Sequence, residues 1–300
     1  MLDRASTFSD PTIVELLRTK FIPVAIDQAY QRRQKDAEGE FYRKIALQGP
    51  RHDFEGSTTQ GFYGATGAGR FLFYNNYRGP GGEERLIGDL RAALASAAEA
   101  GEVSPIADGE LDRQYNPRPP EGGLVLRAHS KVLHGYGPAK DRFEKIFQEG
   151  LGRDNFWITA AEHGALVKGA LPESLKLRLV RFHFVDNTRG EPPMWKRSEV
   201  RALSMTLKDG VIRGAVRLST ADGKRSYDAE MLGYVASDGE KVTRMDLVVR
   251  GLFEGRGEYT KDPPPGKFPL AISFTIADGS DTADAIPPQG SRGWVEGYFE

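Results

Sequence analysis

The sequence predicts two domains: an α/β domain over residues 1–100, and an α+β domain over 124–300 built on an antiparallel β meander, with a linker over 101–123. Three observations lead to this prediction. The 300 residues are about twice the length of a typical domain. Helix and strand patterns alternate in the first hundred residues, whereas Asp-Gly pairs between apolar runs dominate the second half. A segment rich in proline, glycine and charge, which includes NPRPPEGG, separates the two patterns.

The first domain opens with a helix over residues 11–19. Ser9 and Asp10 provide an N-cap, Pro11 suits the first helical position, and apolar residues then recur at helical spacing. The next segment, FIPVAID at 21–27, is mostly apolar and β-branched, which is typical of a strand buried on both faces.

Three further elements complete this domain. Residues 31–47 are mainly charged with one apolar stripe and predict an exposed amphipathic helix. Two aromatic runs around Gly67, Ala68 and Gly69 predict a hairpin over 61–77. An alanine-rich helix follows to about residue 100, so the expected order is α, β, α, β, β, α.

In the second domain, three short helices are expected at DRFEKIF, TAAEHGALVKG and PESLKLRLVRF. The meander is predicted from four Asp-Gly pairs, because Asp-Gly accepts the positive φ angles of tight hairpin turns. These pairs begin at Asp209, Asp222, Asp238 and Asp278.

Charge and composition exclude several functional classes. Lys and Arg number 41 against 42 Asp and Glu, so the chain lacks the basic excess that favours nucleic acid or anionic lipid, and we expect neither a nucleic-acid nor a membrane partner. No apolar run approaches the roughly 18 residues of a membrane helix. The first residues lack the features of a secretory signal, so the chain as written is expected in the cytoplasm, or exported if a signal peptide is encoded upstream.

The sequence contains no cysteine. Disulfides, thiolate metal sites and a cysteine nucleophile are therefore excluded for this chain. We expect no metal and no cofactor.

The stretch 2–27 resembles the thioredoxin-like superfamily, in which a helix and a strand follow a Cys-x-x-Cys motif. The resemblance extends more loosely to about residue 100 and implies a thioredoxin-like fold for the first domain. The residues that match the family pattern are Phe8, Asp10, Pro11, Val14, Leu17, Phe21, Val24 and Asp27.

This chain departs from the family in three ways, so the expected domain is incomplete or degenerate. The Cys-x-x-Cys motif and the first strand are absent. The place of the family's cis-proline falls near Thr58, Thr59 and Gln60, without a proline. From this place, Thr59 and Gln60 are taken as candidate binding residues. A strand from the second domain or from another protomer is expected to fill the gap beside 21–27.

The densest group of chemical side chains lies in RFHFVDNTRGEPPMW, residues 181–195. His183 and Asp186 are the candidate catalytic pair, as a general base and its orienting carboxylate, and Arg189 and Trp195 are candidate binding residues. The alternative is a loop in which Asp186 and Asn187 make local backbone hydrogen bonds.

The other histidines fit no zinc signature. His129 and His134 are expected to be ordinary hydrogen-bonded or surface residues, and His163 to have a satisfied polar role near a helix end.

The proline- and aromatic-rich segment 259–281 and the C-terminal PPQGSRGWVEGYF have two interpretations. They line a peptide or ligand groove, or they form edge strands protected by proline, with Trp294 and Tyr298 in the core.

The leading functional hypothesis is a thioredoxin-like protein without intrinsic thiol redox activity, with a binding or scaffolding role. The partner is expected to be a protein or peptide, and a homo-oligomer is compatible with the sequence. Two alternatives stay open: the remainder of a thiol or selenol oxidoreductase whose catalytic motif is encoded upstream of Met1, and hydrolase or lyase chemistry in the second domain.

Overall fold

The computed structural model describes residues 7–76, 81–97, 110–260, 262–292 and 295–300. The chain divides into two compact units, an N-terminal unit of residues 2–117 and a C-terminal unit that holds 118–300. The boundary lies inside the predicted linker, but the described residues before it are attached to the N-terminal unit. Asp112, for example, accepts a hydrogen bond from the backbone N–H of Lys35 at 2.8 Å.

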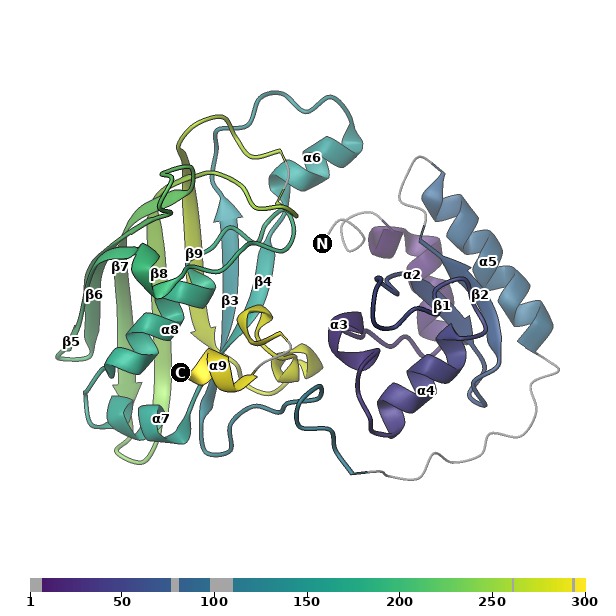
Figure 1. The fold of residues 1–300 in the computed structure, drawn as a ribbon, viewed down its shortest axis with the longest axis horizontal. Helices are drawn as coiled ribbons and strands as arrows, with labels where there is room; N and C mark the ends of the chain where they lie inside the picture. Colours follow the sequence, from purple (N-terminus) through teal and green to yellow (C-terminus); the bar gives the residue numbers. More distant parts are fainter. Residues whose placement is uncertain (1–6, 77–80, 98–109, 261, 293–294) are drawn as a thin grey trace. The chain divides into compact units, whose positions relative to one another are not determined.

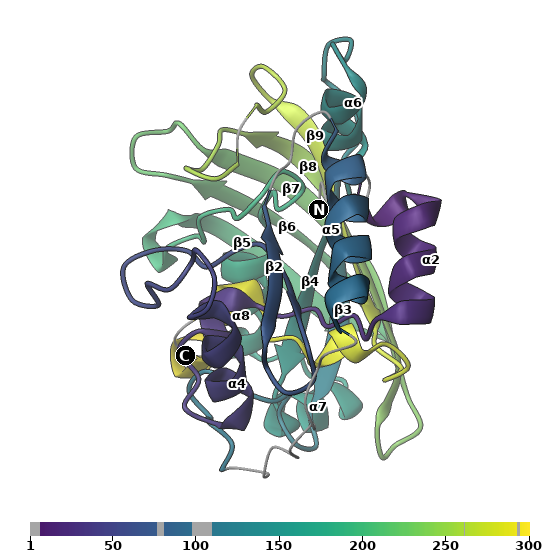
Figure 2. The ribbon, with the colours of Figure 1, turned by 90° about the vertical axis from the view of Figure 1, so that its right-hand side faces the viewer.

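The first long helix, α2, spans Pro11–Lys20 and follows a short 3-10 turn, η1 (Thr7–Ser9). Asp10 caps α2 by accepting hydrogen bonds from two N–H groups, at 2.9 and 3.1 Å. Its buried Ile13 packs against α5 (Gly82–Ala97), and the two helices lie side by side (Figure 2). The prediction of this first helix is confirmed.

Residues 21–27 do not form the predicted strand. They are irregular chain between α2 and α3 (Gln28–Gln31). Ile22 is 90% exposed and Val24 is 75% exposed, so their side chains are not buried on both faces. A strand needs a hydrogen-bonded neighbour, and in the described part of this unit the only paired strands are β1 and β2, which pair with each other. Local β propensity is not sufficient without that neighbour.

The hairpin is confirmed, as β1 (Phe62–Ala65) and β2 (Phe71–Asn75). The predicted helix over 31–47 is shorter and forms α4 (Ala37–Ala46), because Asp36 caps it by accepting a hydrogen bond from the N–H of Gly39 at 3.1 Å. The alanine-rich helix is confirmed to Ala97, and residues 98–100 lie outside the described residues.

The C-terminal unit contains a seven-stranded antiparallel sheet with the strand order β4-β3-β9-β8-β7-β6-β5. Consecutive strands β5 to β9 are neighbours, so the predicted meander is confirmed. The strands are β3 (Leu124–Val132), β4 (Gly152–Ile158), β5 (Val200–Lys208), β6 (Val211–Ser219), β7 (Ser226–Ser237), β8 (Val242–Glu254) and β9 (Phe268–Ile276).

Three of the four Asp-Gly pairs form the hairpin turns of the meander, at Asp209, Asp222 and Asp238. At the first turn, Asp209 and Gly210 have φ angles of 51° and 74°, which match the requirement of a two-residue hairpin. The fourth pair, at Asp278, follows β9 and does not join two strands.

Segment 259–281 contains β9, which lies between β3 and β8. The interpretation of this segment as an edge strand is therefore wrong. Pro269 is tolerated near the start of this strand, where its carbonyl still accepts a hydrogen bond from the N–H of Leu133 at 2.9 Å. Trp294 lies outside the described residues, whereas Tyr298 is buried.

The three predicted short helices are confirmed as α6 (Arg142–Glu149), α7 (Ala160–Val167) and α8 (Glu173–His183). Helices α7, α8 and the C-terminal α9 (Val295–Phe299) lie on one side of the sheet (Figure 1). The apolar residues of α8 and the inward-facing residues of the strands form one core. No helix in the described ranges is long and apolar enough to cross a membrane.

Candidate functional site

His183 lies at the end of α8 and is buried between two polar side chains. Its Nε2 atom lies 2.7 Å from the hydroxyl oxygen of Tyr298, and its Nδ1 atom lies 3.2 Å from Oδ2 of Asp154. The second contact lacks hydrogen-bond geometry. The structure therefore pairs His183 with a carboxylate of strand β4 and a phenol of helix α9.

The donor and acceptor roles in this group follow from Tyr298. Its oxygen accepts a hydrogen bond from the backbone N–H of Trp157 at 3.3 Å. Burial raises the pKa of Tyr298 well above its usual value, so the hydroxyl keeps its proton and is able to donate a hydrogen bond to Nε2 of His183.

Asp154 is held by the backbone. Its Oδ1 atom accepts hydrogen bonds from the N–H groups of Asn155 and Gln289, both at 2.9 Å. A small pocket beside Asp154 and His183 has room for about one water molecule and is also lined by Ser130 and Asn187. Ser130 donates its hydroxyl proton to the side-chain oxygen of Asn187, so the hydroxyl is engaged there.

Asp186 does not orient His183. One of its oxygens accepts hydrogen bonds from the N–H (3.0 Å) and the hydroxyl (2.6 Å) of Thr188, and the other pairs with Arg189. The local backbone role that the sequence offered as the alternative is therefore present for Asp186, whereas the side-chain oxygen of Asn187 accepts a hydrogen bond from Ser130. Arg189 is also buried and donates to the carbonyl of Thr260 at 3.2 Å.

Trp195 is buried in the core of the C-terminal unit. Its indole N–H donates to the carbonyl of Phe184 at 2.8 Å, and the guanidinium of Arg225 lies 3.9 Å from its ring centroid. The side chain is therefore enclosed by protein groups and presents no open face to a ligand.

In the N-terminal unit, Thr59 is fully buried. Its hydroxyl lies 2.7 Å from that of Tyr42 and 3.1 Å from the amide oxygen of Gln28. The neighbouring Gln60 is exposed, and its carbonyl accepts a hydrogen bond from Tyr74 at 2.6 Å. Thr59 and Gln60 are adjacent in the sequence, but of the two only Gln60 is accessible to a ligand.

The remaining histidines do not form a metal site. His163 has both ring nitrogens engaged, with Nδ1 2.9 Å from the carbonyl of Gly122 and Nε2 3.0 Å from the N–H of Val242. Among the residues that the structure describes, no group of three or more His, Asp or Glu side chains could hold a metal ion.

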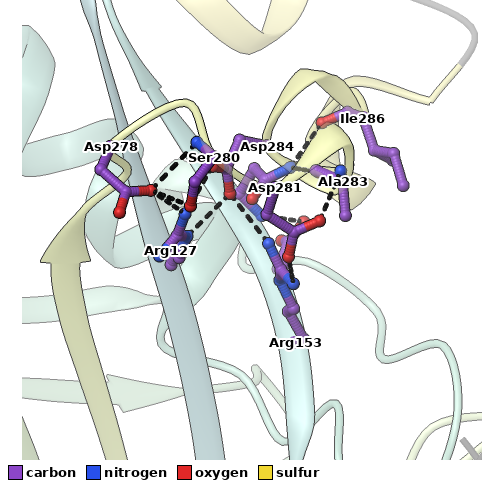
Figure 3. A network of polar contacts seen from close by, with 10 residues as sticks. Arg127, Arg153, Asp278, Ser280, Asp281, Ala283, Asp284 and Ile286 are labelled. Atoms are coloured by element: carbon purple, nitrogen blue, oxygen red, sulfur yellow. Dashed lines mark hydrogen bonds and ion pairs between the residues drawn. The ribbon is translucent and has the colours of Figure 1, made fainter.

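Two arginines on adjacent strands hold the segment that follows β9 (Figure 3). Asp284 bridges Arg127 and Arg153, accepting hydrogen bonds at 2.8 and 2.9 Å through one oxygen. Arg153 also pairs with Asp281 at 2.6 Å and lowers the pKa of that carboxyl, and Arg127 pairs with Asp278 at 2.5 Å. Because both guanidinium groups are paired with carboxylates, we assign this cluster a structural role: it fixes the segment after β9 to strands β3 and β4.

The sheet of the C-terminal unit has an open face, formed by the residues of β6, β7 and β8 that point away from the helices. Large apolar side chains gather at its centre with exposed fractions of 40–52%. They are Leu232, Tyr234, Val248 and Leu252. Leu232, Tyr234 and Val248 are adjacent on this face, and Leu252 lies beyond Arg250. Large apolar side chains that are exposed together on a folded unit are typical of an interaction surface.

Sequence reasoning missed this open face and the partners of His183. The alternating patterns of β7 and β8 predict strands with one buried face. Apolar residues at the outward positions of these strands were the signal for an exposed apolar surface. Asp154 and Tyr298 lie far from His183 in the sequence, so no local pattern links them.

Comparison with known proteins produced no match: no family profile, no curated protein and no solved structure is significantly similar to this chain.

Proposed function

We propose that this chain works by binding a protein partner on the open face of its C-terminal sheet. The observation that carries the proposal is the cluster of Leu232, Tyr234, Val248 and Leu252, which are large, apolar and about half exposed at neighbouring positions of β7 and β8. Leu232 and Val248 are direct cross-strand neighbours and Tyr234 is diagonal to Val248, so these three side chains form one apolar area, from which Arg250 separates Leu252. Charged side chains of both signs surround it, as in the polar rim of a protein interface.

The polar candidates support binding over catalysis. His183, Asp186, Arg189 and Trp195 are buried, and each is engaged by protein groups. A general base has to be within hydrogen-bond reach of a substrate proton, and Nε2 of His183 is engaged by Tyr298 instead.

The N-terminal unit is part of the proposal. We propose that residues 2–117 are a thioredoxin-like module without thiol redox activity in this chain. The order of α2, the β1–β2 hairpin and α5 supports this, together with the absence of cysteine from the sequence.

Site-specific photo-crosslinking tests the binding surface. We would place a photo-crosslinking amino acid at Val248, and at the exposed Glu173 of α8, on the helix side of the sheet, as the control, in cells that produce the chain. We expect a discrete protein adduct at position 248, none at 173, and loss of the adduct when Leu232→Glu is added. Absence of an adduct at 248, or the same adducts at both positions, would overturn the proposal.

A second candidate is hydrolase or lyase chemistry around His183, favoured by the pocket that Ser130, Asp154 and His183 share. The test compares wild type and His183→Ala for hydrolysis of 4-nitrophenyl acetate. A rate that falls in the variant supports this candidate, and an equal rate removes it.

A further inference from the structure

We infer that the partner on the open face is a second copy of this chain, packed face to face about a two-fold axis that runs along the strands between β7 and β8. The inference rests on the proposed function, because it names the partner of the same surface. The cross-strand register of these two strands supports this arrangement.

A two-fold axis of this kind has a definite consequence. It keeps each residue at its height along the strands and places β7 of one copy over β8 of the other. Each outward residue therefore faces the residue that is its own cross-strand partner within a single chain. Closed two-fold pairs of this type are the commonest form of homo-oligomer, and sheets that pack face to face keep their strand directions within about 30° of each other.

In the middle of the two strands, over residues 230–234 of β7, the register makes the surface complementary to itself. Leu232 is opposite Val248, so these apolar side chains would face each other across the axis. Glu230 is opposite Arg250, and Tyr234 is opposite Asp246. The axis would thus bring a carboxylate over a guanidinium and a phenol over a carboxylate, twice each.

The two charges beside the apolar pair are available for such a contact. Glu230 and Arg250 are both exposed, and neither forms an ion pair within the part of the chain that the structure describes. They flank the apolar pair, and interfaces commonly combine an apolar centre with charges that set orientation. A different protein would need a complementary alternation of charged and apolar side chains of its own. A second copy provides this alternation through the two-fold symmetry.

The test uses charge reversal and sedimentation velocity over a range of protein concentrations. We expect the wild type to form dimers. Glu230→Arg and Arg250→Glu each place like charges across the axis, and each should weaken self-association by at least about tenfold. Mixing the two variants should restore dimers, because Arg at 230 of one chain then faces Glu at 250 of the other, and the unaltered Arg250 and Glu230 also meet.

Matched controls carry charge reversals on the helix side of the sheet, away from the open face. They are Glu173→Arg at the start of α8 and Lys168→Glu at the end of α7, at exposed positions, and both should dimerise like the wild type. Circular dichroism of each variant shows that it is folded, and recovery in the mixture excludes misfolding as the cause of the loss.

The outcomes separate this inference from the proposed function. A wild type that stays monomeric, or charge-reversed variants that dimerise unchanged, would overturn the second-copy inference. An adduct at Val248 with a different protein would then leave the proposed function standing, whereas a monomer without any adduct would overturn both.

Discussion

At the scale of single residues, the buried polar groups of the C-terminal unit hold distant parts of the chain together. Tyr298 joins helix α9 to His183 of α8 and to the backbone of Trp157 in β4. Tyr298→Phe removes the hydroxyl, so the backbone N–H of Trp157 and Nε2 of His183 lose this partner in a buried position. We expect the free energy of unfolding to fall by about 1–3 kcal/mol.

Urea denaturation followed by tryptophan fluorescence measures this effect. All three tryptophans lie in residues 118–300, so the signal reports on the C-terminal unit. Tyr234→Phe is the matched control, because its hydroxyl is on the exposed face, and it should change stability by less than about 0.5 kcal/mol. Equal effects of the two variants would show that the Tyr298 hydroxyl contributes nothing.

Glu162 and Arg178 form a buried ion pair in the same unit. Burial by itself would raise the pKa of Glu162, but hydrogen bonds from Arg178, Thr159 and Ser174 lower it below 4.5 overall. The stabilisation from this carboxylate is therefore present above that pH and is lost as the pH falls through the folded-state pKa.

Glu162→Gln leaves Arg178 as a buried unpaired cation. We expect a loss of about 3–5 kcal/mol at pH 7, and a difference from wild type that shrinks as the pH is lowered below 4.5. The control is Glu173→Gln, in an exposed pair with Lys176, which should cost at most about 1 kcal/mol. A pH-independent difference would contradict the role of the ionised carboxylate.

At the scale of secondary-structure elements, the hairpin turns depend on backbone conformation. Gly210 has a φ of 74°, and an added Cβ would lie 2.9 Å from the carbonyl oxygen of Val235. Gly210→Ala should therefore destabilise the C-terminal unit by more than about 1 kcal/mol.

The same substitution in a helix should have the opposite sign. Gly164 lies within α7, and an added Cβ would have no atom within 4 Å, so Gly164→Ala should stabilise the unit by about 0.5–1 kcal/mol. Thermal unfolding of both variants measures the pair. Destabilisation of similar size by both would contradict the assignment of the turn.

The contrast between FIPVAID and the meander is also an element-scale result. Both consist of strand-forming residues, but only the meander strands have tight turns that bring a hydrogen-bonding neighbour alongside. Residues 21–27 remain irregular because no strand in the described part of the N-terminal unit pairs with them.

At the scale of the whole molecule, the chemistry is limited by composition. Thiol–disulfide exchange requires a thiolate, and this chain has no cysteine. We expect the purified 300-residue chain to give no turnover in an insulin reduction assay with dithiothreitol above the rate without protein. An active thioredoxin is the positive control, and turnover by the chain would contradict a function based on binding alone.

The sequence by itself determined the absence of thiol chemistry, the capped helix at Pro11, the hairpin and the meander. These depend on residue type or on contacts between near neighbours, such as Asp10 with the first turn of α2 or Asp209-Gly210 with its two strands. Only the tertiary structure decided the partners of His183, the burial of Thr59 and Trp195, and the open face on β7 and β8. Those features arise when segments far apart in the chain pack together, and which face of a strand a helix covers depends on that packing.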